Sequence, residues 1–294
     1  MARRLFIGVD GGGSRTRARL RDEFGKLLGE AEAGPGNVRL PNGYEENIKV
    51  CGLALAAAGL GENELGRVHA GFGLAGAQQD SDLQDVLDRR HPFATLSVDT
   101  DAFAAWLGAF GGRDGAILIL GTGSCGLAVI NGKRTSVGGW GFDIADDGSG
   151  AALGQRAIRH ALWALEGMAP CTPFAEDVLA DFGREAQNAT LWAADATPGD
   201  FAAYAPRAFD HAERGDELAV GVVRECADGA TMLVDRLCGL GAKSVAMIGG
   251  LFPRILPWLD NSARLVMVEP SADAVEGAIL MAQRAYKRIA TGQH

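Results

Sequence analysis

Two short glycine-rich turns, each directly behind an apolar run, carry the residues with the clearest chemical potential. The run Leu5–Val9 leads into Asp10–Ser14, and the run Ala116–Leu120 leads into Gly121–Ser124. β-formers followed by glycines and a hydroxyl indicate hairpin turns whose backbone N–H groups can surround phosphate oxygens. Glycine suits such turns because a Cβ would block both the tight turn and the close approach of an anion. Two turns of this kind in separate halves of the chain predict a phosphate clamp with two parts.

Two aspartates stand where predicted strands end. Asp10 opens the first turn, where a carboxylate suits a Mg²⁺ on the phosphate, held through water; an ordinary turn acid is the alternative. Asp101 follows the predicted strand 95–98 and opens the predicted helix 101–110, so its carboxylate is expected at the carboxyl edge of a sheet. Asp101 could instead be the N-cap of that helix, a role that either of the two preceding residues could also fill.

The elements that must position these groups occur in the same order in both halves of the chain. Periodicity predicts three strands followed by alternating helices and strands. In the first half these are strands 5–9, 16–21 and 27–33, helix 44–58, strand 67–71, helix 80–90, strand 95–98 and helix 101–110. In the second half they are strands 116–120, 126–130 and 134–137, helix 148–164, an α-rich insertion to about residue 216, helix 217–240, strands 244–248 and 264–268, and helix 272–289. This order predicts a duplicated α/β unit with a cleft between two lobes and a boundary near residues 111–115.

The second strand of the first half has a charged pattern of its own. Four arginines alternate with small or apolar residues at Arg15, Arg17, Arg19 and Arg21. A period of two is expected of a strand with one exposed face. We therefore interpret this run as a half-exposed strand.

Bulk properties exclude several classes of protein. The chain has 294 residues, of which 47% are hydrophobic and 22% charged, as in soluble globular proteins of about two domains. A formal net charge of −9 argues against nucleic acid or an anionic membrane as the main partner. Five cysteines without C-x-x-C spacing fit a reducing cytosol, with neither a zinc site nor a disulfide framework. The longest apolar segment, 116–130, is interrupted by glycines and hydroxyls, so we expect no membrane span and a cytoplasmic protein.

Two segments match the dinucleotide-binding pattern G-x-G-x-x-G, at 71–76 and 121–126. That fingerprint must open a helix within a βαβ unit. The second match is followed by a predicted strand and the turn Asn131-Gly132, and the first has no supporting half. No G-x-x-x-x-G-K-[ST] occurs either, so we expect neither NAD binding nor a P-loop.

Taken together, the glycine motifs resemble those of a known superfamily. The turns Asp10–Ser14 and Gly121–Ser124, with Ala246–Gly250, resemble the two phosphate motifs and the adenosine motif of the actin/hexokinase/Hsp70 superfamily. Within it, Thr100–Ala102 and Gly138–Gly150 are similar to the N-acetylglucosamine kinase and bacterial glucosamine kinase group, the BadF/BadG ATPase family. The similarity covers essentially the whole chain and is especially close to bacterial glucosamine kinases in segments 74–77 and 121–126.

The resemblance implies a fold and a reaction. The fold would be two ribonuclease H-like lobes of the actin/hexokinase type, 1–113 and 114–294, with the last helix able to pack back on the boundary. The reaction would be ATP- and Mg²⁺-dependent phosphorylation of a hexosamine at its 6-hydroxyl. A homodimer through the second lobe is also implied.

Site residues follow from the same resemblance. Asp10 would position Mg²⁺ through water, and Asp101 would be the catalytic base facing the sugar 6-hydroxyl. Asn37 and Asp146 would bind sugar hydroxyls. The nucleotide would contact the three glycine motifs through Gly11, Gly12, Gly13, Ser14, Gly121, Thr122, Gly123, Ser124, Gly249 and Gly250.

The chain departs from the family pattern in ways that bear on the substrate. N-acetylglucosamine kinases often carry a serine near the acyl group where this chain has Ala75, which favours glucosamine. Trp140 matches the acetylsugar kinases better and makes N-acetylglucosamine the second choice; a sugar contact and an ordinary core or surface position are both open for it. Asp147 replaces the usual glutamate. A solvated acidic turn is an alternative interpretation of Asp143, Asp146 and Asp147.

A different class of function is the alternative. Some relatives are ATPases that activate a partner enzyme and carry cysteines for a shared iron–sulfur cluster. The scattered cysteines here disfavour that class, and ATP turnover that rises only with sugar would separate the two.

Overall fold

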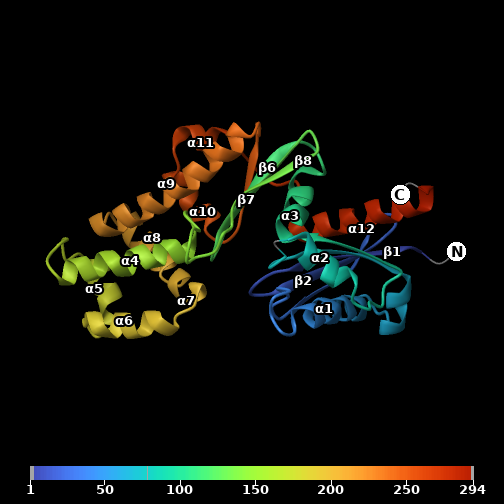
Figure 1. The fold of residues 1–294 in the computed structure, drawn as a ribbon, viewed down its shortest axis with the longest axis horizontal. Coiled ribbons are helices and arrows are strands. Elements are labelled where there is room, and N and C mark those ends of the chain that lie inside the picture. Colours follow the sequence, from blue (N-terminus) through green and yellow to red (C-terminus); the bar gives the residue numbers. More distant parts are fainter. Residues whose placement is uncertain (1–2, 78, 293–294) are drawn as a thin grey trace. The chain divides into compact units, whose positions relative to one another are not determined.

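The structure is a computed structural model that describes residues 3–77 and 79–292. The chain forms two compact units, which are described separately (Figure 1). The first consists of Met1–Arg113 together with Glu269–His294, and the second of Asp114–Val268. The C-terminal segment from Glu269 thus belongs with the N-terminal unit. From the sequence, residues 114–294 were expected in the second lobe, with the last helix able to pack back on the boundary.

The sheet of the first unit is built around its first strand. Its order is β3-β2-β1-β4-β5. β1, β2 and β3 are antiparallel neighbours, whereas β4 and β5 run parallel to β1. The bounds are β1 Leu5–Gly11, β2 Thr16–Asp22, β3 Leu27–Ala33, β4 Val68–Leu74 and β5 Thr95–Thr100.

The second unit repeats this topology. Its sheet has the order β10-β9-β6-β7-β8, which corresponds strand for strand to the first sheet when read from β8. β6 pairs antiparallel with β7 and parallel with β9, as β1 does with β2 and β4. The bounds are β6 Gly115–Leu120, β7 Ser124–Ile130, β8 Lys133–Gly138, β9 Val245–Ile248 and β10 Met267–Val268. The predicted duplication is confirmed.

Helices cover both faces of the first sheet. Leu5, Ile7 and Val9 of β1 are buried in the core that helix α1 (Gly43–Ala57) closes, whereas Phe6 packs with Ile279 of α12 (Ala274–Thr291). Because successive strand residues point to opposite faces, α1 and α12 lie on opposite sides of the sheet. The remaining helices of this unit are the 3₁₀ helix η1 Glu62–Arg67, α2 Asp80–Leu87 and α3 Asp101–Phe110.

Helix α12 fits the first unit so closely that glycines are required at the contact. A Cβ on Gly277 would lie 1.8 Å from the carbonyl oxygen of Ala104 in α3, and one on Gly108 would lie 2.1 Å from that of Asp273. Both distances are far below van der Waals contact, so the two helices meet backbone to backbone. This packing explains why the C-terminal helix belongs to the N-terminal unit, where it runs along the sheet (Figure 1).

The second unit owes its core to long helices and the predicted α-rich insertion. Helix α9 packs on the sheet, and helix α4 packs against α9 and the helices of the insertion. The bounds are α4 Gly150–Leu165, α5 Pro173–Ala180, α6 Ala186–Asp195, α7 Pro198–Ala202, α8 Ala205–Glu213, α9 Glu217–Gly239, α10 Phe252–Ile255, η2 Leu256–Trp258 and α11 Asn261–Leu265. The predicted strand 264–268 is wrong for its first residues, because α11 occupies them and only Met267 and Val268 pair with β9.

Candidate functional site

The first glycine turn is shorter than the sequence predicted. Strand β1 continues through Asp10 and Gly11, which pair with Arg17 and Thr16 of β2. The turn itself begins at Gly12, whose N–H donates to the carbonyl of Arg15 at 3.0 Å. Gly13 and Ser14 at its tip are exposed. The predicted hairpin is confirmed, but the N–H of Gly12 already has a protein partner, and Gly13 and Ser14 are the exposed part.

Two loops close against this turn and bring Asn37 to it. The carbonyl of Gly12 accepts from the N–H of Gly36 at 3.0 Å, and that of Gly11 accepts from the N–H of Ala75 at 2.9 Å. Asn37 lies beside Gly76, where a Cβ would come within 2.1 Å of its Oδ1. The first glycine turn, the predicted sugar ligand and the segment that departs from the acetylsugar kinases are therefore neighbours.

A buried asparagine that sequence reasoning missed holds this arrangement. Asn47 of α1 donates from Nδ2 to the carbonyls of Gly36 and Gly43, at 2.8 and 2.7 Å. Its side chain is fully buried, so these bonds replace ones that water would otherwise supply. No sequence motif marked it, because a polar residue on a helix is ordinarily expected at the surface.

Asp101 is the first residue of helix α3 and not its cap. Thr100 is the N-cap, and its hydroxyl accepts from the N–H of Phe103 at 3.1 Å. Oδ1 of Asp101 accepts from the N–H of Ala102 at 2.8 Å. Burial raises the pKa of Asp101 above its ordinary value, and the nearby charge of Asp10 raises it further, against the Ala102 bond. The alternative of an N-cap is thereby removed, and the carboxylate has the environment of a proton acceptor.

Asp10 lies close enough to Asp101 for its charge to raise the pKa of Asp101. The carboxylate of Asp10 is itself held by an arginine. Its Oδ2 accepts from Nη2 of Arg17 at 2.7 Å. Among the described residues no group of three or more histidine, cysteine or acidic side chains gathers to hold a metal ion. Mg²⁺ with its water shell needs only one or two carboxylates besides a nucleotide's phosphates. Oδ1 of Asp10, which has no protein partner in the described part of the chain, fits that requirement.

The second glycine turn is fixed from behind by a helix. The carbonyls of Gly121 and Thr122 accept from the N–H groups of Gly150 and Ala151, the first residues of α4, at 2.8 and 3.1 Å. The Ser124 hydroxyl donates to the carbonyl of Asp147 at 2.8 Å. Both flanks of the turn are thus fastened to the segment 146–151.

Asp146 lies beneath this second turn. Its carboxylate accepts from the backbone N–H groups of Ser124 and Gly141, and a Cβ on Gly123 would lie 2.8 Å from its Oδ2. Asp146 is buried and has a φ of 84°, in the left-handed region that residues other than glycine rarely adopt. Burial raises its pKa, against those two hydrogen bonds. The carboxylate of Asp146 therefore supports the second turn from inside the second unit, besides any contact with a sugar. Asn37, the other predicted sugar ligand, belongs to the first unit.

The other predicted residues of this region differ in exposure. Trp140 is 74% exposed between two glycines of positive φ, so it is a surface aromatic and not part of the core. Asp147 pairs with Arg156 of α4 at 3.0 Å, which makes it more than a solvated turn acid.

The segment predicted to form the adenosine motif packs on the end of β6. Gly249 has a φ of 115°, and a Cβ there would lie 2.1 Å from the carbonyl oxygen of Leu120. Gly250 has no neighbour within 4 Å of the same position. The close approach at Gly249 is therefore to the protein's own backbone beside the second turn, whereas Gly250 is the open position.

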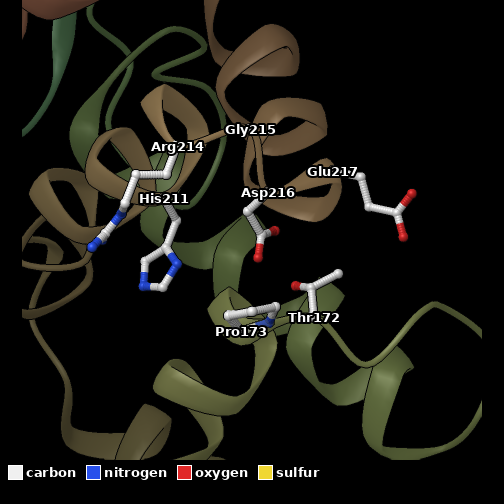
Figure 2. Close-up of a pocket in the computed structure, with 7 residues that line it drawn as sticks. All are labelled: Thr172, Pro173, His211, Arg214, Gly215, Asp216 and Glu217. Atoms are coloured by element: carbon white, nitrogen blue, oxygen red, sulfur yellow. The ribbon is translucent and has the colours of Figure 1, made fainter.

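The α-rich insertion contains a hollow of about 580 Å³ that none of the predicted site residues lines. Figure 2 shows His211 and Arg214 on one side of Asp216 and Glu217 pointing away on the other. The carboxylate of Asp216 already accepts from the N–H groups of Leu218 and Ala219, both at 3.1 Å. The carboxylate of Asp216 thus caps the start of α9.

The comparisons with known proteins identify the class of this chain. Residues 7–282 match the BadF/BadG/BcrA/BcrD ATPase family. The chain belongs to this family, as its motifs indicated.

Two relatives are more specific. The chain is 37% identical over 281 residues to the glucosamine kinase GspK of Vibrio cholerae, across 94% of this chain and 95% of that protein. It is 33% identical over 183 residues to an N-acetylmuramic acid/N-acetylglucosamine kinase of Clostridium acetobutylicum, across 60% and 59% of the two chains.

Solved structures agree with the fold. A protein of Chromobacterium violaceum assigned as an N-acetylglucosamine kinase superposes with a TM-score of 0.88 at 34% identity, over 95% of this chain and 99% of that one. A ROK family glucokinase of Streptomyces griseus shares the fold, with a TM-score of 0.58 at 22% identity over 96% and 99%. The predicted actin/hexokinase-type α/β fold is confirmed. Within residues 3–77 and 79–292, none of the helices has the length and apolar character of a membrane span.

Proposed function

We propose that the protein is an ATP- and Mg²⁺-dependent hexosamine kinase that forms the sugar 6-phosphate. The observation that carries the proposal is the environment of Asp101: a shielded carboxylate with a raised pKa, relieved of helix capping by Thr100 and close to Asp10. The full-length similarity to a glucosamine kinase supports the same reaction.

In the proposed reaction the sugar 6-oxygen bonds to the γ-phosphorus of ATP while the bond from that phosphorus to the β–γ bridging oxygen breaks. ADP leaves, and the hydroxyl proton passes to Asp101. A transfer of this kind needs alignment and charge stabilisation more than covalent chemistry by the protein. The exposed turn residues Gly13 and Ser14, with the second turn Gly121–Ser124, would hold phosphates through backbone N–H groups and hydroxyls. Mg²⁺, when bound, would offset charge on the phosphates.

Glucosamine is the proposed substrate and N-acetylglucosamine the second choice. Ala75 offers no hydroxyl to an acyl group, and its neighbour Gly76 packs against Asn37, the proposed sugar ligand. A glucosamine kinase is 37% identical across 94% of the chain, and the Chromobacterium violaceum protein assigned as an N-acetylglucosamine kinase is 34% identical across 95%. Trp140, exposed on the second unit, is the feature that keeps the acetylated sugar in the comparison.

The test is a coupled ADP-release assay with Mg-ATP and glucosamine, N-acetylglucosamine or glucose, with the product identified by phosphorus NMR. We expect turnover to require sugar and to be highest with glucosamine. Higher turnover with N-acetylglucosamine would keep the kinase and reverse the preference. ATP hydrolysis that is equal with and without sugar would overturn the proposal in favour of a partner-activating ATPase.

A further inference from the structure

The arginine strand β2 does more than cover an exposed face of the sheet. In the β1–β2 register Arg17 lies opposite Asp10, Arg19 opposite Gly8 and Arg21 opposite Phe6. Since Phe6 packs against α12, the arginines lie on the face of the sheet that α12 covers. All three guanidinium groups have acidic partners there, so the alternation that indicated a half-exposed strand marks a set of ion pairs.

Two acids at the start of α12, the N-cap Asp273 and Glu276 in the first turn, accept these ion pairs. Asp273, the N-cap of α12, receives two hydrogen bonds from Arg19, at 2.9 and 3.0 Å, and itself accepts from the N–H of Glu276 at 2.9 Å. Oε2 of Glu276 accepts a hydrogen bond from Nε of Arg21 at 2.9 Å. Burial would raise the pKa of Asp273, but the bonds from Arg19 and the Glu276 N–H, with the charge of Arg17, hold it below its ordinary value. Asp273 is thus an ionised, well-fixed anchor.

Arg17 lies between this anchor and the first glycine turn. Its Nη1 is 3.9 Å from Oδ2 of Asp273, while its Nη2 donates to Oδ2 of Asp10 at 2.7 Å. The side chains of Arg17 and Asp10 are only 32% and 20% exposed. A partly shielded, charge-assisted bond with an anchored donor restrains the carboxylate far more than a free surface pair would.

We propose that Arg17 is a positioning residue that holds Asp10 by Oδ2 and so leaves Oδ1 to receive the water shell of the Mg²⁺ carried by the nucleotide. The proposal rests on the metal role proposed for Asp10. With one oxygen committed to the guanidinium and its charge partly offset, Asp10 favours contact through water over direct ligation, which suits a cation that loses its water shell reluctantly. A partner that orients a metal-binding carboxylate contributes measurably to metal affinity.

The test measures nucleotide binding by calorimetry, with Mg²⁺ and with EDTA, in wild type, Arg17→Gln and Arg21→Gln. Arg21→Gln is the matched control, because it removes an arginine of the same strand and its pair with α12 but does not touch Asp10. We expect Arg17→Gln to weaken Mg-ATP binding about 10- to 100-fold while metal-free ATP binding changes less than about threefold. Arg21→Gln should leave the ratio of the two affinities at the wild-type value.

Arg17→Lys keeps the charge without the planar fork, and we expect it to restore part of the lost Mg²⁺ dependence. It also keeps the test decisive if Arg17→Gln proves unstable, which thermal unfolding would show. Equal losses with and without Mg²⁺, or identical ratios in the Arg17 and Arg21 variants, would overturn the proposal. Sugar-dependent turnover of the wild type is measured separately, so the kinase can stand while the role of Arg17 falls.

Discussion

The two glycine turns look alike in sequence and are secured in different ways. The first, after β1, presents exposed Gly13 and Ser14, and the acid at its base is held by an arginine on the neighbouring strand. The second, after β6, is fastened through its carbonyls to α4 and lies on the buried carboxylate of Asp146. The first turn thus keeps a carboxylate at its surface, and the second uses one as internal support. Duplicated topology does not impose duplicated chemistry.

The two carboxylates proposed for proton transfer and for the metal both belong to the first unit. They are Asp101 and Asp10, and the charge of Asp10 raises the pKa of Asp101. In the second unit, the acid nearest the turn is Asp146, whose carboxylate is engaged by backbone N–H groups. We therefore expect substitutions in the first unit to act mainly on turnover, and those around the second turn to act mainly on stability.

The largest expected effect is on turnover, from Asp101→Asn. Loss of a general base typically costs about 10²- to 10⁴-fold in rate, and the amide is almost the same size as the carboxylate. We expect kcat to fall by that factor while the affinity for sugar, measured by calorimetry, stays within about threefold. Asp99→Asn is the control, because its carboxylate bonds the N–H of Thr100 at 2.9 Å on the preceding strand. Near-wild-type turnover of Asp101→Asn would remove this residue from the role of base.

Two pH measurements sharpen the same prediction. The base acts when ionised, so turnover should fall as pH drops through a pKa above the ordinary value of about 3.9. A carboxyl with a raised pKa binds its proton more tightly in the folded state, so stability falls as pH rises from the ordinary value to the raised one. Asp101→Asn should therefore gain in melting temperature relative to wild type as pH rises through that window. A gain that is independent of pH would contradict the raised pKa.

The largest expected effect on stability is in the second unit, from Gly249→Ala. The new Cβ would lie 2.1 Å from the carbonyl oxygen of Leu120, at a φ of 115°. Strain and overpacking together should cost about 2–5 kcal/mol of unfolding free energy, measured by denaturant titration. Gly250→Ala, with open space around its Cβ position, should cost less than about 0.5 kcal/mol. Equal costs at the two positions would show that β9 does not pack on β6 as described.

A smaller contrast compares the two turns directly. Gly123→Ala would place a Cβ 2.8 Å from Oδ2 of Asp146, whereas Gly13→Ala meets nothing within 4 Å. We expect the first change to cost about 1–3 kcal/mol of unfolding free energy and the second less than about 0.5 kcal/mol. Thermal unfolding of both variants checks this. Equal destabilisation would mean that the first turn is as tightly supported as the second.

The sequence predicted the frame of the molecule well because strands and helix starts are local events. Helix 101–110 and strand 27–33 were predicted with their observed ends, since capping residues and turn glycines mark them. The strand predicted at 264–268 was wrong in its first part, because apolar periodicity cannot separate a one-turn helix from a strand. The close fit of α12 to α3 depends on long-range contacts that no local pattern reports.

The candidate site was predictable in its residue types but not in its partners. The glycines, Asp10 and Asp101 could be found because each follows a predicted strand in the sequence, which marks it as a candidate site residue. Arg17 was visible only as part of an alternating run, although the hairpin register of β1 and β2 would have placed it opposite Asp10. The supporting role of Asp146 could not be predicted, because its partners Ser124 and Gly141 come close to its carboxylate only in the folded protein.

The smallest expected effect concerns substrate choice in the first unit. Ala75 is held at both its N–H and its carbonyl, by Gly11 at 2.9 Å and Val38 at 3.1 Å, so a new side chain there would start from a fixed backbone. We expect Ala75→Ser to raise kcat/KM for N-acetylglucosamine relative to glucosamine by about tenfold, the worth of one added hydrogen bond. Ala75→Cys, similar in size but a weak donor, is the matched control and should leave the ratio within about twofold. If serine and cysteine shift the ratio equally, size rather than hydrogen bonding decides the preference, and if neither shifts it, the acyl discrimination lies with the second unit, where Trp140 is exposed.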